Sequence, residues 1–149
     1  MSDIRIDGRS IYDTPMFLTL LSRETGRASR YRDFFGLCLI TRDRPGPDGA
    51  AEASTLHATI AELLRTTDLV GRVDDGVAVV LINTSPSDSL AIAERLRARL
   101  VASGPASIGL ASFPRDGTDP QSLLDRARAL VEQARHDGGN RVRDADHSD

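Results

Sequence analysis

The sequence of 149 residues contains no lysine, no tryptophan and a single cysteine, Cys38. One cysteine excludes an intrachain disulfide and a cysteine-rich zinc site, so we expect Cys38 to pack as a small buried apolar side chain. The three histidines lie far apart, without the spacing of metal ligands, and we expect His57 on the surface of a helix. The composition therefore predicts no resident metal and no cofactor.

Long hydrophobic runs are absent as well. The longest run, Val77 to Ile82, is too short to cross a bilayer, and the N-terminal segment MSDIRIDGRS is too polar for a secretory signal. All 19 basic residues are arginines, and 22 acidic residues give a net charge of -3, which argues against nucleic acid as the default partner. We expect a cytoplasmic protein without membrane contact.

Proline and capping residues mark the helix starts. Thr14-Pro15, Ser85-Pro86 and Asp119-Pro120 each place a capping side chain before a proline, at the position where a missing N–H costs nothing. Apolar spacing then predicts four helices, the first from about Pro15 to Ser29 with Phe17, Leu18 and Leu21 facing inward. Continuous apolar runs predict strands at residues 34–41, 68–73, 77–82 and 106–113, with a short edge strand at 141–142.

This order predicts an α+β fold with a ferredoxin-like core. Such a core has an antiparallel-rich central sheet with helices on one face, here flanked by additional helices. We expect an N-terminal extension at residues 1–11, one domain at 12–144 and a disordered tail at 145–149. Residues 42–51, with two prolines and two glycines, are expected to form a loop.

The segment Val73-Asp74-Asp75-Gly76 connects two strand-like runs. Asp-Gly at such a position is a strong hairpin signal, because glycine accepts the positive φ of a tight turn. Two adjacent carboxylates at a hairpin tip can also hold a divalent metal through oxygen ligands. The residues alone leave both interpretations open.

From Tyr12 to Val142 the chain resembles a GGDEF domain, which in its active form condenses two GTP into cyclic di-GMP. The most specific likeness is C-terminal, in the segments SIGLASFPRDGTDPQSLL and GGNRV. The segment LVGRV, residues 69–73, is similar to the approach to the family's signature hairpin. The signature itself is altered, because the residues at its five positions are Asp74, Asp75, Gly76, Val77 and Ala78.

The resemblance implies that the altered positions matter for chemistry. The paired glycines that approach the nucleotide are replaced by Asp74 and Asp75, and the two signature acids by Gly76 and Val77. Thr41 takes the place of a further metal carboxylate, although Asp43 keeps the next acidic position. The segment that recognises the base is also shortened. In the last helix, three residues differ from the family's usual ones: Arg128, Glu132 and Arg135, the last replacing a phosphate-binding lysine. Because phosphoryl transfer relies on positioned metal ions, these changes predict a relic hairpin and a pseudoenzyme.

One motif keeps the family's spacing. Arg65 and Asp68 form an RxxD, which in this family can bind cyclic di-GMP, since guanidinium pairs with phosphate and a carboxylate accepts from guanine. Alternatively, Arg65 is a solvated residue near a helix end and Asp68 opens a strand. Arg72 and Arg135 have the same two interpretations, ligand contact or surface solubility.

Two classes of function follow from the sequence. The first is an inactive regulatory module of bacterial signalling that binds a protein partner or forms a homodimer. The second is a cyclic di-GMP receptor that uses Arg65 and Asp68, and an active diguanylate cyclase is a distant third.

Overall fold

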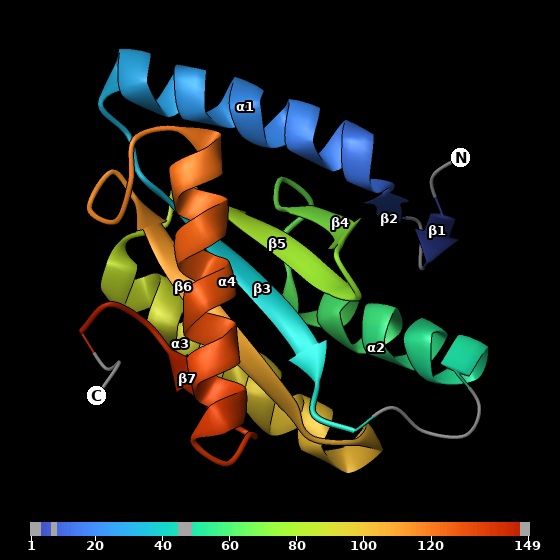
Figure 1. Ribbon diagram of the computed structural model, residues 1–149. Coiled ribbons are helices and arrows are strands. Elements are labelled where there is room, and N and C mark those ends of the chain that lie inside the picture. Colours follow the sequence, from blue (N-terminus) through green and yellow to red (C-terminus); the bar gives the residue numbers. More distant parts are fainter. Residues whose placement is uncertain (1–3, 7–8, 45–48, 147–149) are drawn as a thin grey trace.

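The structure, a computed structural model, describes residues 4–6, 9–44 and 49–146. A single seven-stranded sheet forms its centre, with four α-helices around it (Figure 1). Along the chain the elements are β1 (Ile4–Ile6), β2 (Arg9–Tyr12), α1 (Thr14–Tyr31), β3 (Phe35–Arg42), α2 (Gly49–Leu63), β4 (Leu69–Val73), β5 (Gly76–Ile82), α3 (Pro86–Leu100), a 3-10 turn η1 (Val101–Ser103), β6 (Ala106–Phe113), α4 (Pro120–His136) and β7 (Val142–Arg143).

The sheet is mixed but mainly antiparallel. Its strand order is β1-β2-β4-β5-β3-β6-β7, and β3 lies at the centre between β5 and β6, antiparallel to both. Parallel pairing occurs only toward the two sides, between β2 and β4 and between β6 and β7. The predicted α+β class is confirmed.

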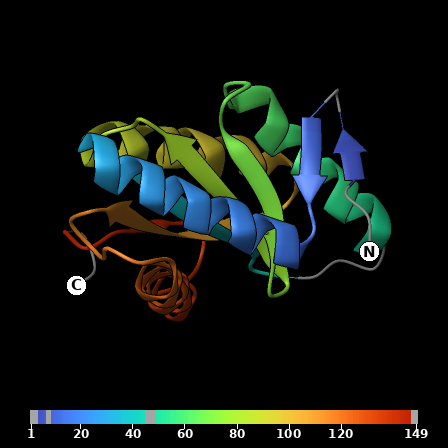
Figure 2. The ribbon, with the colours of Figure 1, turned by 90° about the horizontal axis from the view of Figure 1, so that it is seen from above.

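Helices cover both faces of the sheet. α1 and α4 lie on one face and α2 and α3 on the other, as the view from above shows (Figure 2). Each face has its own apolar core, because alternate residues of β3 point to opposite sides: Leu37 and Leu39 pack with α1 and α4, Cys38 and Ile40 with α2 and α3. The central sheet flanked by helices is therefore confirmed, with α1 and α4 on one face and α2 and α3 on the other.

Three helix starts are capped by side chains. Ser85 and Asp119 act as the N-caps predicted for α3 and α4, each accepting from a backbone N–H inside the first turn. For α1 the prediction was wrong by one residue, because the carboxylate of Asp13 accepts from the N–H of Met16 at 3.1 Å. The hydroxyl of Thr14 instead donates to the carbonyl of Arg72, which attaches the start of α1 to β4.

Several local predictions change in the folded chain. The segment 9–12 forms β2 and adds a strand to the sheet, and Leu18 is 37% exposed although its spacing suggested the core. His57 is buried, not on the surface, and burial beside the positive charge of Arg72 lowers the pKa of its imidazole. Cys38 is fully buried as expected, and burial raises the pKa of its thiol to about 12. Most of the predicted tail, residues 147–149, lies outside the described residues.

No helix in the described part of the chain has the length and apolarity needed to cross a membrane.

Candidate functional site

The signature hairpin is a tight two-residue turn between β4 and β5. Val73 and Gly76 face each other as the last pair of the ladder, so Asp74 and Asp75 form the tip. The positive φ of the turn, 56°, falls on Asp74 and not on the glycine. Aspartate tolerates this left-handed conformation better than most residues, which explains an acid at this position without any ligand.

Gly76 has a packing reason of its own. A Cβ at this position would lie 2.3 Å from the carbonyl oxygen of Ile40 and 2.9 Å from Cγ2 of Thr41, both on β3. The nearest obstacle is backbone, which cannot rotate away as a side chain can. The family resemblance places a metal-binding acid at this position. The space that its side chain would need is filled by the neighbouring strand β3.

Thr41 lies next to this contact, at the end of β3. Its side chain is buried, and among the described residues its hydroxyl has no hydrogen-bond partner. A threonine hydroxyl is a weak, neutral oxygen ligand compared with a carboxylate. Within the described chain, no group of three or more histidine, cysteine, aspartate or glutamate residues is arranged to hold a metal ion.

Asp74 at the tip is bound by helix α4. Arg128 holds its carboxylate with two nearly parallel hydrogen bonds, from Nε at 2.9 Å and from Nη2 at 3.1 Å. The hydrogen bond to Asp74 is the main reason that the pKa of the Arg128 guanidinium is raised. This bidentate pair holds the hairpin tip against α4. It also engages Asp74, one of the two adjacent acids that the sequence suggested as metal ligands.

Asp43 is also engaged by the protein. Its Oδ1 accepts from the hydroxyl of Ser107 at 2.5 Å, and its Oδ2 accepts from the backbone N–H of Asn140 at 2.7 Å. Gly139 permits this approach, because a Cβ there would stand 2.7 Å from the carboxylate and its φ is 75°. The carboxylate thus joins β3 to β6 and to the turn after α4.

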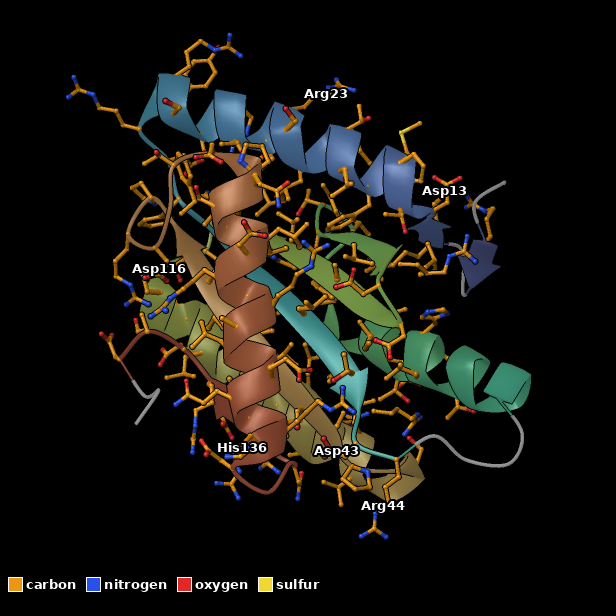
Figure 3. The ribbon with its side chains drawn as sticks, in the orientation of Figure 1. Asp13, Arg23, Asp43, Arg44, Asp116 and His136 are labelled. Atoms are coloured by element: carbon orange, nitrogen blue, oxygen red, sulfur yellow. The ribbon has the colours of Figure 1, made fainter. Side chains whose placement is uncertain are left out.

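A shallow cleft of about 500 Å³ lies beside Asp43 at the C-terminal end of α4. Asp43, Arg44 and His136 gather at this end of the molecule (Figure 3). Arg135, which the sequence suggested as a phosphate contact, lines the cleft and pairs with Glu132 at 3.4 Å. The cleft therefore keeps basic groups but lacks a metal-binding set.

Internal hydrogen bonds hold both residues of the RxxD pair, Arg65 and Asp68. The Asp68 side chain is 2% exposed and accepts from the backbone N–H of Arg65 at 3.0 Å and of Ile82 at 3.1 Å. The guanidinium of Arg65 bonds to Asp68, to the carbonyl of Ile82 and to the hydroxyl of Thr84. About half of the Arg65 side chain, 54%, remains exposed. The pair fastens the turn before β4 to the end of β5, and only Arg65 has a solvent-facing part.

Comparison with known proteins identifies the family. The sequence profile described as "Diguanylate cyclase, GGDEF domain" matches residues 53–141, which is more than half of the chain. The chain belongs to the GGDEF domain family. Among curated proteins, none matches the sequence at a significant level.

Solved GGDEF structures share the fold over nearly the whole chain. The GGDEF domain of PA1120 (TpbB or YfiN) from Pseudomonas aeruginosa is 25% identical, with a TM-score of 0.84 over 95% of this chain and 94% of that one. The GGDEF domain of DgcB from Caulobacter crescentus, in complex with c-di-GMP, is 16% identical, with a TM-score of 0.84 over 95% of this chain and 96% of that one. Diguanylate cyclase SiaD from Pseudomonas aeruginosa, in complex with its activator SiaC, is 21% identical, with a TM-score of 0.83 over 91% of this chain and 59% of that one.

Sequence reasoning missed one side chain that supports the RxxD turn of this GGDEF domain. Arg9 of β2 donates to the carbonyl of Asp68 at 2.7 Å and also reaches the carbonyls of Leu64 and Arg65. These carbonyls follow the end of α2 and lack helical partners, so a guanidinium satisfies them and complements the helix dipole. The only signal in the sequence is an arginine next to a short β-prone run, which is too weak to predict the contact.

Proposed function

We propose that this GGDEF domain is catalytically inactive and acts as a regulatory module through protein–protein contact. The observation that carries the proposal is the packing of Gly76 against β3. The Cβ of an acid at this position would collide with the Ile40 carbonyl, so a metal ligand would fit here only if β5 or β3 shifted. A second acid is replaced by Val77, which is buried in the core on the α2–α3 side.

The remaining acids support the same conclusion. Asp43 and Asp74 each accept two hydrogen bonds from protein groups. Hydrogen bonds to a charged group contribute about 1.5–3 kcal/mol each where they are shielded from water, and less at the exposed Asp74–Arg128 pair, and a metal ion would have to replace them. Without positioned metal ions, the charge that develops on the phosphates during transfer is not neutralised.

An activity assay tests the inactive state. Purified protein incubated with GTP and either Mg²⁺ or Mn²⁺ should yield no cyclic di-GMP above a protein-free control, while an active diguanylate cyclase run in parallel confirms the conditions. The Asp75→Ala variant should behave as the wild type does. Turnover by the wild type that disappears in Asp75→Ala would show that the tip has rebuilt a working site, and the proposal would be wrong.

The interaction role predicts a stable partner. A fold that holds no substrate keeps its outer helical faces available for contact, and the relative SiaD was solved with a protein activator. We expect a homodimer or a heteromeric complex in place of an isolated monomer. Light scattering of the purified protein gives its mass, and crosslinking in the native lysate tests for the partner. A monomer that crosslinks to nothing would contradict the interaction role.

Cyclic di-GMP binding is the second candidate function. The half-exposed guanidinium of Arg65 favours it, and the relative DgcB was solved with c-di-GMP. Asp68 would first have to leave its internal partners before it could accept from a guanine. Calorimetry with cyclic di-GMP is the direct test. Arg65→Ala should weaken binding about tenfold or more, whereas Asp74→Ala should leave it nearly unchanged.

GTP is not expected at the hairpin tip in either case. The triphosphate is strongly anionic, Asp74 is already paired with Arg128, and the described residues hold no set of ligands that would place a magnesium ion between the triphosphate and the remaining charge of Asp75. Calorimetry with GTP and magnesium should therefore show no binding. If wild-type protein binds neither nucleotide at high micromolar ligand, the receptor function is excluded and the protein-contact function remains.

A further inference from the structure

Aromatic side chains are scarce in this chain, which has four phenylalanines, two tyrosines and no tryptophan. Three of the phenylalanines lie in the core, at positions 17, 35 and 113. Tyr31 and Phe34, in contrast, are exposed by 67% and 39%. They are three positions apart, where α1 ends and β3 begins, at the end of α1 that lies away from β1 and β2 (Figure 1). Single exposed apolar side chains need no explanation, but two of these few aromatic residues at one junction indicate a contact surface.

The same junction is rich in positive charge. Residues 14–34 contain four arginines and two acids, a net charge of +2 in a chain whose net charge is -3. Both acids, Glu24 and Asp33, pair with Arg27, at 2.6 Å and 2.9 Å. In the described part of the chain the other three arginines form no ion pair: Arg23, Arg30 and Arg32. Their side chains are exposed and therefore give this end of α1 a positive potential.

An arginine and a tyrosine are in contact at this junction. The guanidinium of Arg30 lies over the ring of Tyr31, 5.3 Å from its centroid. The negative face of the ring attracts the cation, and both side chains remain accessible because both are exposed. Tyrosine and arginine are among the residue types that most often dominate the binding energy of protein interfaces. The pair thus offers a partner an apolar ring beside hydrogen-bond donors for a carboxylate.

Internal hydrogen bonds fix the turn that carries both aromatic residues. α1 ends at Arg32, whose φ of 54° is left-handed and whose N–H bonds to the carbonyl of Ala28. The N–H of Asp33 bonds to the same carbonyl at 2.8 Å, and its carboxylate accepts from the N–H of Phe34 at 2.9 Å and from Arg27 at 2.9 Å. A surface that is ordered before binding loses less conformational entropy when a partner arrives.

The charge of this surface favours one kind of partner over others. In a two-fold dimer through this surface, the arginines of one copy would face those of the other, and like charges across an interface repel each other. Nucleic acid is anionic, but a net charge of -3 disfavours it as a partner. A protein segment with acidic side chains around an apolar one complements both the guanidinium groups and the rings.

We propose that the surface formed by Arg30, Tyr31, Arg32 and Phe34 is the docking site for the partner protein, and that the partner presents an acidic segment with an apolar side chain at its centre. The proposal rests on the protein-contact function and assigns it a place on the fold. The rings take the apolar side chain, while Arg30 and Arg32 pair with the carboxylates around it. Neither the signature hairpin nor the RxxD pair takes part.

The peptide acetyl-Glu-Asp-Leu-Phe-Asp-Glu-amide is the probe, and the same peptide with lysine at its four acidic positions is the comparison. Titration followed by NMR reports which amide signals of the protein move. The acidic peptide should shift the signals of residues 30–34 and bind more weakly as salt is added, whereas the lysine peptide should leave these signals unchanged. Equal shifts with both peptides, or no shift in the millimolar range, would overturn the proposal.

Two variants and a matched control locate the contact. Arg30→Gln/Arg32→Gln should weaken binding of the acidic peptide about threefold or more, because two exposed charge-assisted contacts are lost. Tyr31→Ala should weaken it by a similar factor through loss of the ring. Arg126→Gln removes an exposed arginine of α4 that forms no ion pair with a described residue, and it should leave the affinity unchanged. An equal loss in Arg126→Gln would show general charge attraction and would overturn the proposal.

Crosslinking of the whole protein separates this proposal from the protein-contact function. In the native lysate, the complex that the wild type forms should be lost in Arg30→Gln/Arg32→Gln and kept in Arg126→Gln. A complex that survives the double substitution leaves the protein-contact function standing and overturns the surface proposed here. A crosslink from this surface to a second copy of the chain, or to nucleic acid, would overturn it as well. The absence of any complex contradicts both proposals.

Discussion

Gly76→Ala tests the packing on which the proposed inactive state depends. The added Cβ would stand 2.3 Å from the carbonyl oxygen of Ile40, far inside contact distance, and the obstacle belongs to the central strand β3. β3 pairs with β5 along six residues, so the strands cannot separate at this point without loss of neighbouring hydrogen bonds. Overpacking of this kind costs typically about 1–3 kcal/mol in free energy of unfolding. For a chain of this length, the melting temperature should fall by about 3–10 °C.

Gly26→Ala is a matched control with the opposite expected effect on the melting temperature. Gly26 lies inside α1, and a Cβ there meets nothing within 4 Å. Alanine in a helix interior is more favourable than glycine by about 0.5–1 kcal/mol. The same chemical change should therefore raise the melting temperature at position 26 and lower it at position 76.

Calorimetric or circular dichroism melting of the three proteins provides the measurement. Chemical denaturation gives the free energy of unfolding and shows whether the slope with denaturant changes. If Gly76→Ala is as stable as the wild type, the β3–β5 contact is looser than the structure shows. An acid could then fit at position 76, and the argument for an inactive site would lose its main support.

Three other perturbations follow from the contacts of single residues. Asp68→Ala should destabilise the fold by about 1–3 kcal/mol in urea unfolding, because it removes an acceptor from the guanidinium of Arg65 and from the partly buried N–H of Ile82; a loss below about 0.5 kcal/mol would show that the turn does not depend on the carboxylate. A double-mutant cycle on Asp74 and Arg128 should give a coupling of only about 0.2–1 kcal/mol that decreases with salt, since both side chains are more than a third exposed; a coupling that salt does not change would contradict a solvent-screened pair. The lowered pKa of His57 means that the unfolded chain binds its proton more readily, so its contribution to stability is full above pH 6.5 and is lost as pH falls below that value toward the folded pKa. His57→Gln should remove this slope from the pH dependence of the melting temperature, and an unchanged slope would assign it to other groups.

The sequence predicted those parts of the fold that depend on local patterns. The strand at residues 106–113 agrees with β6 at both ends, and the regularly spaced apolar residues of α4 are buried: Leu123, Leu124, Ala127, Leu130, Val131 and Ala134. Both results come from residues close together in the chain: continuous apolarity in a central strand, and a 3.6-residue period under a cap at Asp119. The hairpin itself was predicted for the same reason, from Asp-Gly between two apolar runs.

Contacts between distant residues could not be predicted in this way. Arg9 and Asp68 are 59 positions apart, and Asp74 and Arg128 are 54 apart. No helical or strand period relates residues this far apart in the chain. The sequence also does not distinguish an arginine that is solvated from one that is held by hydrogen bonds. The burial of His57 has the same cause, because it depends on how α2 packs in the folded chain and not on the helix alone.

The acids that made the site look functional in the sequence are used to hold the fold together. Asp43 joins β3 to β6 and to the turn after α4, Asp68 joins the turn before β4 to the end of β5, and Asp74 joins the hairpin to α4. A metal ion would compete with protein donors at each of them, and no two of them share a set of ligands in the described structure. The signature hairpin therefore has a structural reason to persist without catalysis: its tip fastens α4 to the sheet, and its glycine lets β5 approach β3 closely enough to close the core.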